Sequence, residues 1–317
     1  MKIRIGIVGY GNLGKAVECE VLKNSNYKLV AIFSRRLVAS AFGTTVEPYE
    51  NYVNYKNKID VMLLCGGSKN DLEPQTQDIA QHFDCINTFD THAKIAKHLQ
   101  NVDNIAKESR HLAIISCGWD PGLFSNIRAM IYKFLDAEPI TFWGKGISMG
   151  HSDAIRQVKG VDDGVQFTIP NKEAMTLAGK GRLDQQTPRH FRECFIASSS
   201  TDKTRIESEI KNIPSYFKGQ PTTINFVSQE KIFKLKSKMF HGGEIIGISS
   251  NNKSSKFSMK FTVKMSSNPA FTAKLMTAYI NAILRLKQTQ THGAFTPLDI
   301  PVSYLYKDRT ELVKKFC

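Results

Sequence analysis

The first third of the chain alternates short apolar runs with segments whose apolar residues recur every three or four positions. The apolar runs cover residues 2–8, 28–33, 60–65, 85–89 and 111–116, and the periodic segments cover 16–22, 74–83 and 91–110. Short apolar runs predict buried strands, and a helical period predicts amphipathic helices. Their alternation predicts an α/β fold, a Rossmann-type doubly wound parallel sheet.

The pattern changes at about residue 121. A helix is expected over 121–135, and strands then predominate at 140–144, 164–170, 191–197, 222–229, 244–249 and 257–265, with helices at 152–158, 171–178, 202–211 and 269–287. Antiparallel strands with a few helices predict an α+β arrangement. We therefore expect a first domain over residues 1–120, completed by about 295–317, and a second over 121–294.

Two segments carry weaker patterns. Residues 44–58 are rich in Tyr and Asn, and we expect an irregular connection there. In residues 231–238, Lys alternates with apolar side chains, which is the period of a half-exposed strand.

The turn after the first strand contains three spaced glycines, in the run Gly9-Tyr10-Gly11-Asn12-Leu13-Gly14. In a dinucleotide-binding unit the first glycine permits the tight turn, the second lets a pyrophosphate approach the backbone, and the third lets helix and strand pack closely. The helix that follows directs free N–H groups and the positive end of its dipole toward the phosphates. The first domain is therefore expected to bind a dinucleotide.

The second strand ends in Ser34-Arg35-Arg36. Proteins that prefer NAD usually place an acidic residue here against the ribose 2′-hydroxyl. Two guanidinium groups and a hydroxyl suit a 2′-phosphate, which a carboxylate would repel. We therefore predict NADP(H) as the cofactor, the alternative being that the arginines are solvated charges at a strand end.

Three later strands end at the same predicted edge of the sheet, where parallel sheets bind their ligands. The residues expected to line the cofactor there are Gly66, Gly67, Ser68, Thr88, Phe89, Asp90, Cys117, Gly118, Trp119, Asp120 and Pro121. A simple turn is the alternative for the glycine pair.

Asp90 and Asp120 are the candidate catalytic residues. A pair of carboxylates at this edge can hold a substrate ammonium group and accept protons while a hydride moves to the cofactor. Each has a structural alternative, since an Asp before Thr91 can cap a helix and Asp-Pro-Gly is a common turn. Their joint placement favours the chemical interpretation.

Composition narrows the possible partners. The formal net charge of +14 could attract nucleic acid, but the basic residues are dispersed, so we expect no nucleic-acid partner and attribute the charge to attraction for a phosphorylated cofactor and a carboxylate substrate. The six cysteines and the histidines show no metal-binding spacing, so no metal is expected. No apolar run is long enough to span a membrane, and we expect a cytoplasmic protein without a membrane partner.

Several polar or aromatic residues of the second domain lie in otherwise apolar or Gly-rich surroundings. They are Trp143, Met149, Gly150, Thr168, Arg192, His241 and Asn268. Trp143, Met149 and Gly150 belong to the block 141–153, and such a stretch of Gly, aromatic and polar residues usually lines a site, the alternative being a Gly-rich hairpin. Thr168, Arg192, His241 and Asn268, taken singly, are each more often structural residues than ligands, and the residues alone do not group them.

Motifs along nearly the whole chain resemble the meso-diaminopimelate dehydrogenase family. Besides the glycine turn and Ser34-Arg35-Arg36, they are Gly118-Trp119-Asp120-Pro121-Gly122, Thr141-Phe142-Trp143-Gly144, Gly150-His151-Ser152-Asp153-Ala154, His241-Gly242-Gly243 and Gly293-Ala294-Phe295-Thr296. The resemblance implies NADP-dependent, reversible oxidative deamination of meso-2,6-diaminopimelate at its D-centre. The products would be L-2-amino-6-oxopimelate (tetrahydrodipicolinate when cyclised) and ammonia, in the biosynthesis of lysine and cell-wall precursors.

The resemblance also implies roles for residues. Asp90 and Asp120 would hold the amino group at the D-centre, in a pocket end shaped by Trp119, Trp143, Met149 and Gly150. The distal L-centre would be held by Thr168, Arg192, His241 and Asn268, with Arg192 pairing to its carboxylate. The family is homodimeric, and the second domain would bind substrate and form the dimer. Two alternatives remain, namely another amino-acid or sugar-acid dehydrogenase of this architecture and a cofactor-binding protein without turnover.

Overall fold

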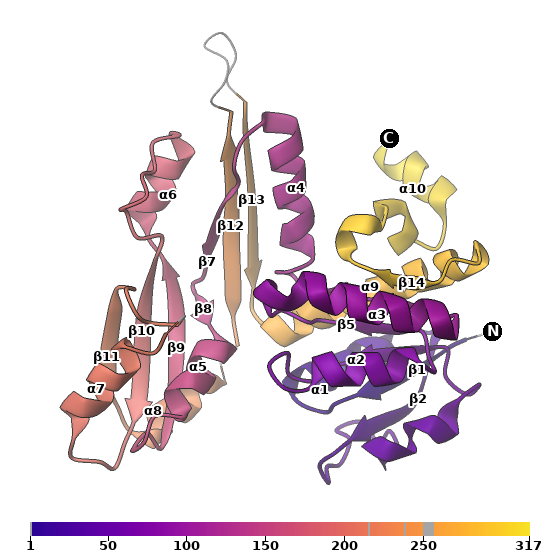
Figure 1. Cartoon of the computed structure of the whole chain (residues 1–317), viewed down its shortest axis with the longest axis horizontal. Coiled ribbons are helices and arrows are strands. Elements are labelled where there is room, and N and C mark those ends of the chain that lie inside the picture. Colours follow the sequence, from indigo (N-terminus) through magenta and orange to yellow (C-terminus); the bar gives the residue numbers. More distant parts are fainter. Residues whose placement is uncertain (1, 215, 238, 250–256) are drawn as a thin grey trace. The chain divides into compact units, whose positions relative to one another are not determined.

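The computed structural model describes residues 2–214, 216–237, 239–249 and 257–317. It divides into two compact units. The first comprises Met1–Asn126 and Pro269–Cys317, and the second comprises Ile127–Asn268. Each unit is described by itself below, with the element labels of Figure 1.

The first unit is built on a seven-stranded parallel sheet in the order β14-β6-β5-β4-β1-β2-β3. Its strands are β1 (Ile3–Val8), β2 (Tyr27–Ser34), β3 (Val46–Pro48), β4 (Val61–Leu64), β5 (Cys85–Asn87), β6 (Leu112–Ile114) and β14 (Gly293–Phe295). The strand order reverses between β1 and β4, which is where an open parallel sheet binds its ligand.

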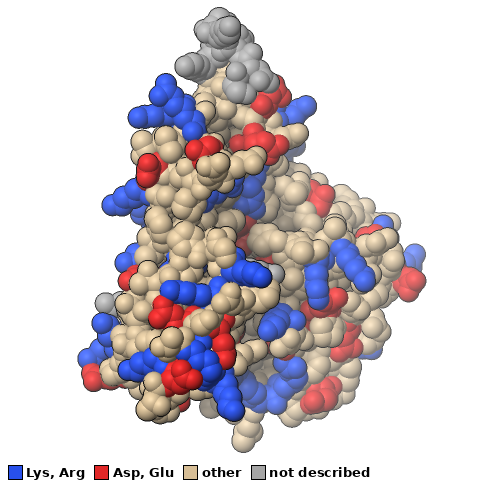
Figure 2. Space-filling view, turned by 60° about the vertical axis from the view of Figure 1, so that its left-hand side comes forward, with Lys and Arg blue, Asp and Glu red and all other residues tan. Residues whose placement is uncertain are grey.

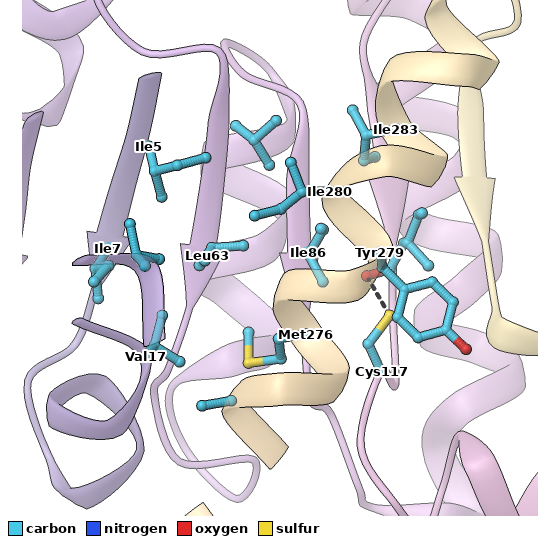
Figure 3. Packing of buried hydrophobic residues seen from close by; sticks show 14 of the residues in the cluster. Ile5, Ile7, Val17, Leu63, Ile86, Cys117, Met276, Tyr279, Ile280 and Ile283 are labelled. Carbon is cyan, nitrogen blue, oxygen red and sulfur yellow. Dashed lines mark hydrogen bonds between the residues drawn. The ribbon is translucent and has the colours of Figure 1, made fainter. Parts of the chain in front are cut away.

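Helices cover both faces of this sheet. One face packs against α1 (Asn12–Lys23) and α9 (Asn268–Gln288). Met276 and Ile280 of α9 belong to the same buried cluster as Ile7 and Leu63 of the strands (Figure 3). The other packs against α2 (Leu72–Ala80) and α3 (Ile95–Ser109). Short 3-10 helices (Tyr49–Tyr55, His92–Lys94, Pro297–Asp299, Val302–Leu305) and α10 (Arg309–Phe316) complete the unit. Apolar side chains on both faces of every central strand explain the continuous apolar runs in the sequence.

The expected irregular connection at residues 44–58 is more ordered than its composition indicates. It contains strand β3 and a 3-10 helix over Tyr49–Tyr55. Tyr52 of that helix is buried and its ring lies 5.3 Å from that of Tyr49 and 6.1 Å from that of Phe83. The tyrosines that made the segment look like a loop are thus part of the core on one sheet face.

In its described residues, the second unit contains two sheets. The four-stranded sheet has the order β11-β10-β9-β8, with β8 (Gly146–Ile147), β9 (Asp163–Pro170), β10 (His190–Ala197) and β11 (Thr222–Phe226). The three-stranded sheet has the order β13-β12-β7, with β7 (Ile140–Trp143), β12 (His241–Ile248) and β13 (Ser258–Met265). All pairs are antiparallel except β10 and β11, which are parallel, so the expectation of antiparallel strands is wrong for that pair.

Among the described residues, five helices accompany these sheets, although the start of α4, up to Asn126, belongs to the first unit. They are α4 (Leu123–Leu135), α5 (Met149–Arg156), α6 (Lys172–Gly179), α7 (Lys203–Lys211) and α8 (Gln229–Lys236). Ile155 of α5 and Ile206 of α7 pack with Ile196 of β10, whereas Ile232 of α8 packs with Phe167 of β9. The parallel sheet of the first unit and this α+β unit confirm the expected fold class.

The expected half-exposed strand at residues 231–238 is wrong, because most of the segment belongs to helix α8. The hydroxyl of Ser228 caps the helix by accepting a hydrogen bond from the N–H of Lys231. Ile232 is fully buried and Phe233 is 76% exposed, so the two apolar residues do not share a face. The alternation counted Phe233 as an inward residue, and Lys238 lies outside the described residues.

The unit boundaries differ from the expected domains in one main respect. Helix α9, apart from its first residue, belongs to the first unit, although the sequence pattern gave residues 269–294 to the second domain. The reason is its packing, since buried residues on α9 complete the core on one face of the parallel sheet. A strand-rich segment followed by a helix carries no signal of which sheet the helix covers.

The surface carries no single basic patch on the face drawn in Figure 2, where Lys and Arg side chains are interspersed with Asp and Glu. Within the described ranges, no helix is long and apolar enough to cross a membrane.

Candidate active site

The glycine turn joins β1 to α1 in the conformation that the motif requires. Gly9 has φ +88°, and a Cβ on Gly14 would lie 2.2 Å from the carbonyl oxygen of Gly9. By contrast, a Cβ on Gly11 would meet no atom within 4 Å. The first and third glycines are therefore required by the turn and by packing, whereas the second keeps the backbone open to a ligand.

The start of α1 faces this turn. Gly11 is the N-cap residue and provides no side chain to bond the first N–H groups of the helix. Those groups suit a pyrophosphate, because they combine free donors with the positive end of the helix dipole. A Cβ on Gly9 would also lie 3.1 Å from the N atom of Gly66, so the loops after β1 and β4 meet at the point where the strand order reverses.

Ser34, Arg35 and Arg36 follow β2 at the same edge of the sheet. The Ser34 hydroxyl accepts a hydrogen bond from the Arg36 N–H at 3.1 Å, which shapes the turn. Both arginine side chains are exposed, and Arg35 forms an ion pair with Asp71. Asp71 also accepts a hydrogen bond from the N–H of Gly67 at 3.0 Å, so it connects Arg35 to the loop after β4.

Asp90 lies just beyond β5, and its backbone N–H donates to the Ser68 hydroxyl at 3.1 Å. This bond joins two of the predicted cofactor segments. Thr88 is partly exposed, whereas the Phe89 side chain is fully buried. Phe89 can therefore contact a ligand only through its backbone.

Asp120 lies beyond β6, the neighbour of β5 in the sheet. Gly118 and Gly122 bridge the two ends of this loop, and a Cβ on Gly122 would lie 2.1 Å from the Gly118 carbonyl oxygen. Trp119 is buried and its ring packs edge-on against Phe124 at 5.1 Å. The Cys117 side chain is also fully buried, so only its backbone could reach a cofactor. Asp90 and Asp120 thus follow adjacent strands, as the sequence predicted.

In the second unit, Thr168 and Arg192 face each other on β9 and β10. Nη1 of Arg192 donates to Oγ1 of Thr168 at 3.1 Å. Burial lowers the pKa of Arg192, and its Nε atom is buried without a hydrogen-bond partner among the described residues. A half-buried guanidinium with an unpaired donor is suited to an anionic ligand such as a carboxylate.

His241 and Trp143 lie on neighbouring strands of the other sheet of this unit. A Cβ on Gly146 would lie 2.5 Å from the His241 ring, and Gly146 pairs with Thr168 across β8 and β9, so His241 lies near the Thr168 pair. The backbone N–H of Trp143 donates to Nε2 of His190 at 2.8 Å, and the indole and imidazole rings stack with 5.2 Å between their centroids.

The remaining predicted residues of this unit lie on α5 and just after β13. Met149 and Gly150 form the first turn of α5, where Met149 is 46% exposed and Gly150 approaches Tyr216. The N–H of Asn268 donates to the carbonyl of Met239 at 2.8 Å, which places Asn268 close in the fold to the start of β12. The predicted residues therefore form two sets, one on the sheet edge of the first unit and one within the second.

Known proteins match both units. Residues 118–267 match the family model described as the diaminopimelic acid dehydrogenase C-terminal domain. The meso-diaminopimelate D-dehydrogenase of Acetivibrio thermocellus is 44% identical over 99% of this chain and 97% of its own length. That of Corynebacterium glutamicum is 36% identical over 94% and 93%, respectively. The chain belongs to the meso-diaminopimelate dehydrogenase family.

Two solved structures of similar enzymes contain bound ligands. The C. glutamicum diaminopimelate dehydrogenase in complex with diaminopimelate has a TM-score of 0.93 at 34% identity, with 99% of each chain covered. An engineered D-amino acid dehydrogenase bound to NADP⁺ has a TM-score of 0.91 at 33% identity, with both chains fully covered. These likenesses extend over both units.

Sequence reasoning missed three residues that support the candidate site of this dehydrogenase. Asn87 is a fully buried amide at the end of β5, His190 supports Trp143, and Asp71 pairs with Arg35. Burial and Arg192 together lower the pKa of His190 to about 4, so it is neutral and its Nε2 can accept the Trp143 N–H. The partners are separated by many residues, and a local pattern does not reveal them.

No cluster of His, Cys, Asp and Glu that could hold a metal ion occurs in the described part of the chain.

Proposed function

We propose that this chain catalyses the reversible, NADP-dependent oxidative deamination of meso-2,6-diaminopimelate at its D-centre. With water, the substrate and NADP⁺ give L-2-amino-6-oxopimelate, ammonium, NADPH and a proton. The observation that carries the proposal is the full-length likeness to relatives named for this activity, at up to 44% identity. Both catalytic directions use the same residues, and the reverse direction serves lysine and cell-wall precursor synthesis.

The residues of the first unit fit NADP(H). The open position beside Gly11 and the uncapped start of α1 suit the pyrophosphate, and Arg35 and Arg36 suit the 2′-phosphate. Further contacts would come from the loops after β4, β5 and β6, at the residues Gly66, Gly67, Ser68, Thr88, Phe89, Cys117, Gly118 and Pro121. When bound, the cofactor supplies the hydride acceptor of the deamination.

Asp90 and Asp120 would hold the ammonium group of the D-centre at this edge of the sheet. Two carboxylates oriented toward one ammonium group form charge-assisted hydrogen bonds that fix the direction of its neighbouring C–H bond. They also favour the loss of protons from nitrogen as the carbon is oxidised. The family resemblance assigns Trp119, Trp143, Met149 and Gly150 to the D-centre of the substrate as well.

Arg192 and its neighbours would hold the distal L-centre. The unpaired Nε of Arg192 suits the distal carboxylate, with Thr168, His241 and Asn268 as further polar partners. A nearly symmetric substrate has to be bound in one direction, so different polar groups are needed at its two ends. A site that hydrogen-bonds a group rejects analogues lacking it by about 10⁴-fold, far more than pocket size alone.

The chain is further proposed to be a cytoplasmic homodimer. On α4, Met130 and Phe134 are 41% and 69% exposed and lie about one helical turn apart on the same side, and exposed apolar residues that share a face favour a protein interface. The six cysteines are free, as expected in a reducing compartment.

Sedimentation velocity should give the mass of a dimer at micromolar concentration, and Phe134→Asp should shift the distribution toward monomer. A monomeric parent protein would contradict the assembly.

A substrate panel separates this function from its alternatives. With NADP⁺, the initial rate for meso-diaminopimelate should exceed that for D-amino acids with one amino-acid end, and for sugar acids, by about 10²-fold or more. The reason is that only meso-diaminopimelate carries an amino-acid group for each of the two sets of polar residues. Faster turnover of another panel member would support a different dehydrogenase of this architecture. Cofactor binding without any turnover would support a non-enzymatic role.

A further inference from the structure

The amide of Asn87 is a fully buried hub at the end of β5. Its Oδ1 accepts hydrogen bonds from the backbone N–H groups of Phe89 at 2.9 Å and Ser116 at 3.0 Å. Its Nδ2 donates to Oγ1 of Thr76 at 2.8 Å and lies 3.3 Å from Nε2 of His98. The side chain therefore uses both acceptor and both donor positions of a primary amide.

The two backbone groups that Asn87 holds belong to the loops of the candidate catalytic carboxylates. Phe89 directly precedes Asp90, and Ser116 lies four residues before Asp120. Strands β5 and β6 are paired through Ile86 and Ile114, and beyond that pair the loops have left the regular ladder. One side-chain oxygen thus continues the pairing of the two strands into the loops.

Ser116 adds a second link between these loops. Its hydroxyl donates to the carbonyl of Phe89 at 2.8 Å, and the N–H of the next residue, Cys117, donates to the carbonyl of Asn87 at 2.8 Å. Ser116 has φ +61°, a left-handed conformation that residues with a Cβ adopt rarely. Its hydrogen bonds to Asn87 and Phe89 hold this sharp turn in place.

The helices behind the sheet fix the orientation of the amide. Burial lowers the pKa of His98, so its ring is neutral and Nε2 can accept the hydrogen bond from Asn87. The same ring packs on Phe89, with 4.3 Å between centroids. A flipped amide would set Nδ2 against the N–H groups of Phe89 and Ser116, so only the observed orientation satisfies these two donors.

We propose that Asn87 is a positioning residue for the dehydrogenase reaction, because its amide sets the spacing of the loops that carry Asp90 and Asp120. This inference rests on the proposed function, because Asp90 and Asp120 are catalytic residues only in that reaction. Asn87 acts through the backbone and is buried away from solvent. Small errors in the position of reacting groups lower the rate by about 10²-fold. A buried hydrogen-bond network that fixes the spacing of the two loops therefore favours fast turnover.

The test is turnover per folded active site. For Asn87→Ala, kcat for meso-diaminopimelate, normalised to NADPH-binding sites and measured below the variant's unfolding transition, should fall about 10-fold to 100-fold. Thr277→Val is the control, since it removes a buried hydroxyl that bonds only within α9 and should leave normalised kcat within about twofold. A normalised kcat for Asn87→Ala equal to that of the parent protein would overturn the proposal.

Hydrogen exchange gives a second readout that does not depend on activity. Amide exchange of residues 88–90 and 116–120 should quicken at least tenfold in Asn87→Ala, with no such change in Thr277→Val. If Asn87→Ala does not fold, Ser116→Ala removes one link between the loops and should show the same two changes to a smaller degree. If the parent protein is inactive, the proposed function is refuted, and hydrogen exchange alone then tests whether Asn87 holds the two loops. Unchanged amide exchange in Asn87→Ala would refute that role.

Discussion

Replacing Asp120 with asparagine should lower kcat/KM for meso-diaminopimelate by about 10²-fold to 10³-fold while NADP⁺ affinity changes by less than about threefold. The substitution keeps the shape of the side chain and removes its charge. A neutral amide cannot stabilise the substrate ammonium group as a carboxylate does, and it does not help protons leave nitrogen. Initial rates over a range of substrate concentrations and fluorescence titration with NADPH measure the two quantities.

Asp308→Asn is a matched control for this prediction. Asp308 caps α10 through the N–H groups of Thr310 and Glu311, and asparagine caps a helix about as well as aspartate. This control should leave both quantities unchanged. Equal activity of Asp120→Asn and the parent protein would show that Asp120 only shapes the Gly118–Gly122 turn.

The double substitution Arg35→Ala with Arg36→Ala should raise Kd for NADP⁺ by about 10²-fold to 10³-fold and change Kd for NAD⁺ by less than about threefold. Only NADP⁺ carries the 2′-phosphate that the two guanidinium groups would bind. Arg35 is already oriented by its ion pair with Asp71, which reduces the entropy lost on binding. Fluorescence or calorimetric titration with each cofactor gives the constants.

The control Lys314→Ala with Lys315→Ala removes two positive charges from exposed positions on α10. It should leave the selectivity unchanged, which separates a local phosphate site from general attraction by the net charge of +14. If the arginine variant loses affinity for both cofactors equally, the pair has a structural role.

The first unit was the more predictable half of the fold, because its signals are local. Buried strands such as Val61–Leu64 are apolar throughout, and the glycines after β1 each have a steric reason that the structure displays. The helix α8 was missed because Phe233, although apolar, faces solvent. The assignment of α9 to the first unit depends on long-range packing, which periodicity does not encode.

The candidate site was predictable to the extent that topology places strand ends together. Asp90 and Asp120 follow adjacent parallel strands, so one rule brings both to the same edge. The residues of the second unit were grouped and given roles only through the family resemblance, since Thr168 and Arg192 meet across a strand register that the sequence does not specify. Asn87 and Ser116 bond across 29 positions, and only the folded chain reveals that link.

The most direct test of the central claim follows NADPH and ammonium together when the protein is given NADP⁺ and one stereoisomer of diaminopimelate. The account predicts that the meso isomer yields one ammonium per NADPH and that the L,L isomer, which has no D-centre, yields neither. Equal rates with the two isomers, or NADPH formation without ammonium release, would contradict deamination at the D-centre.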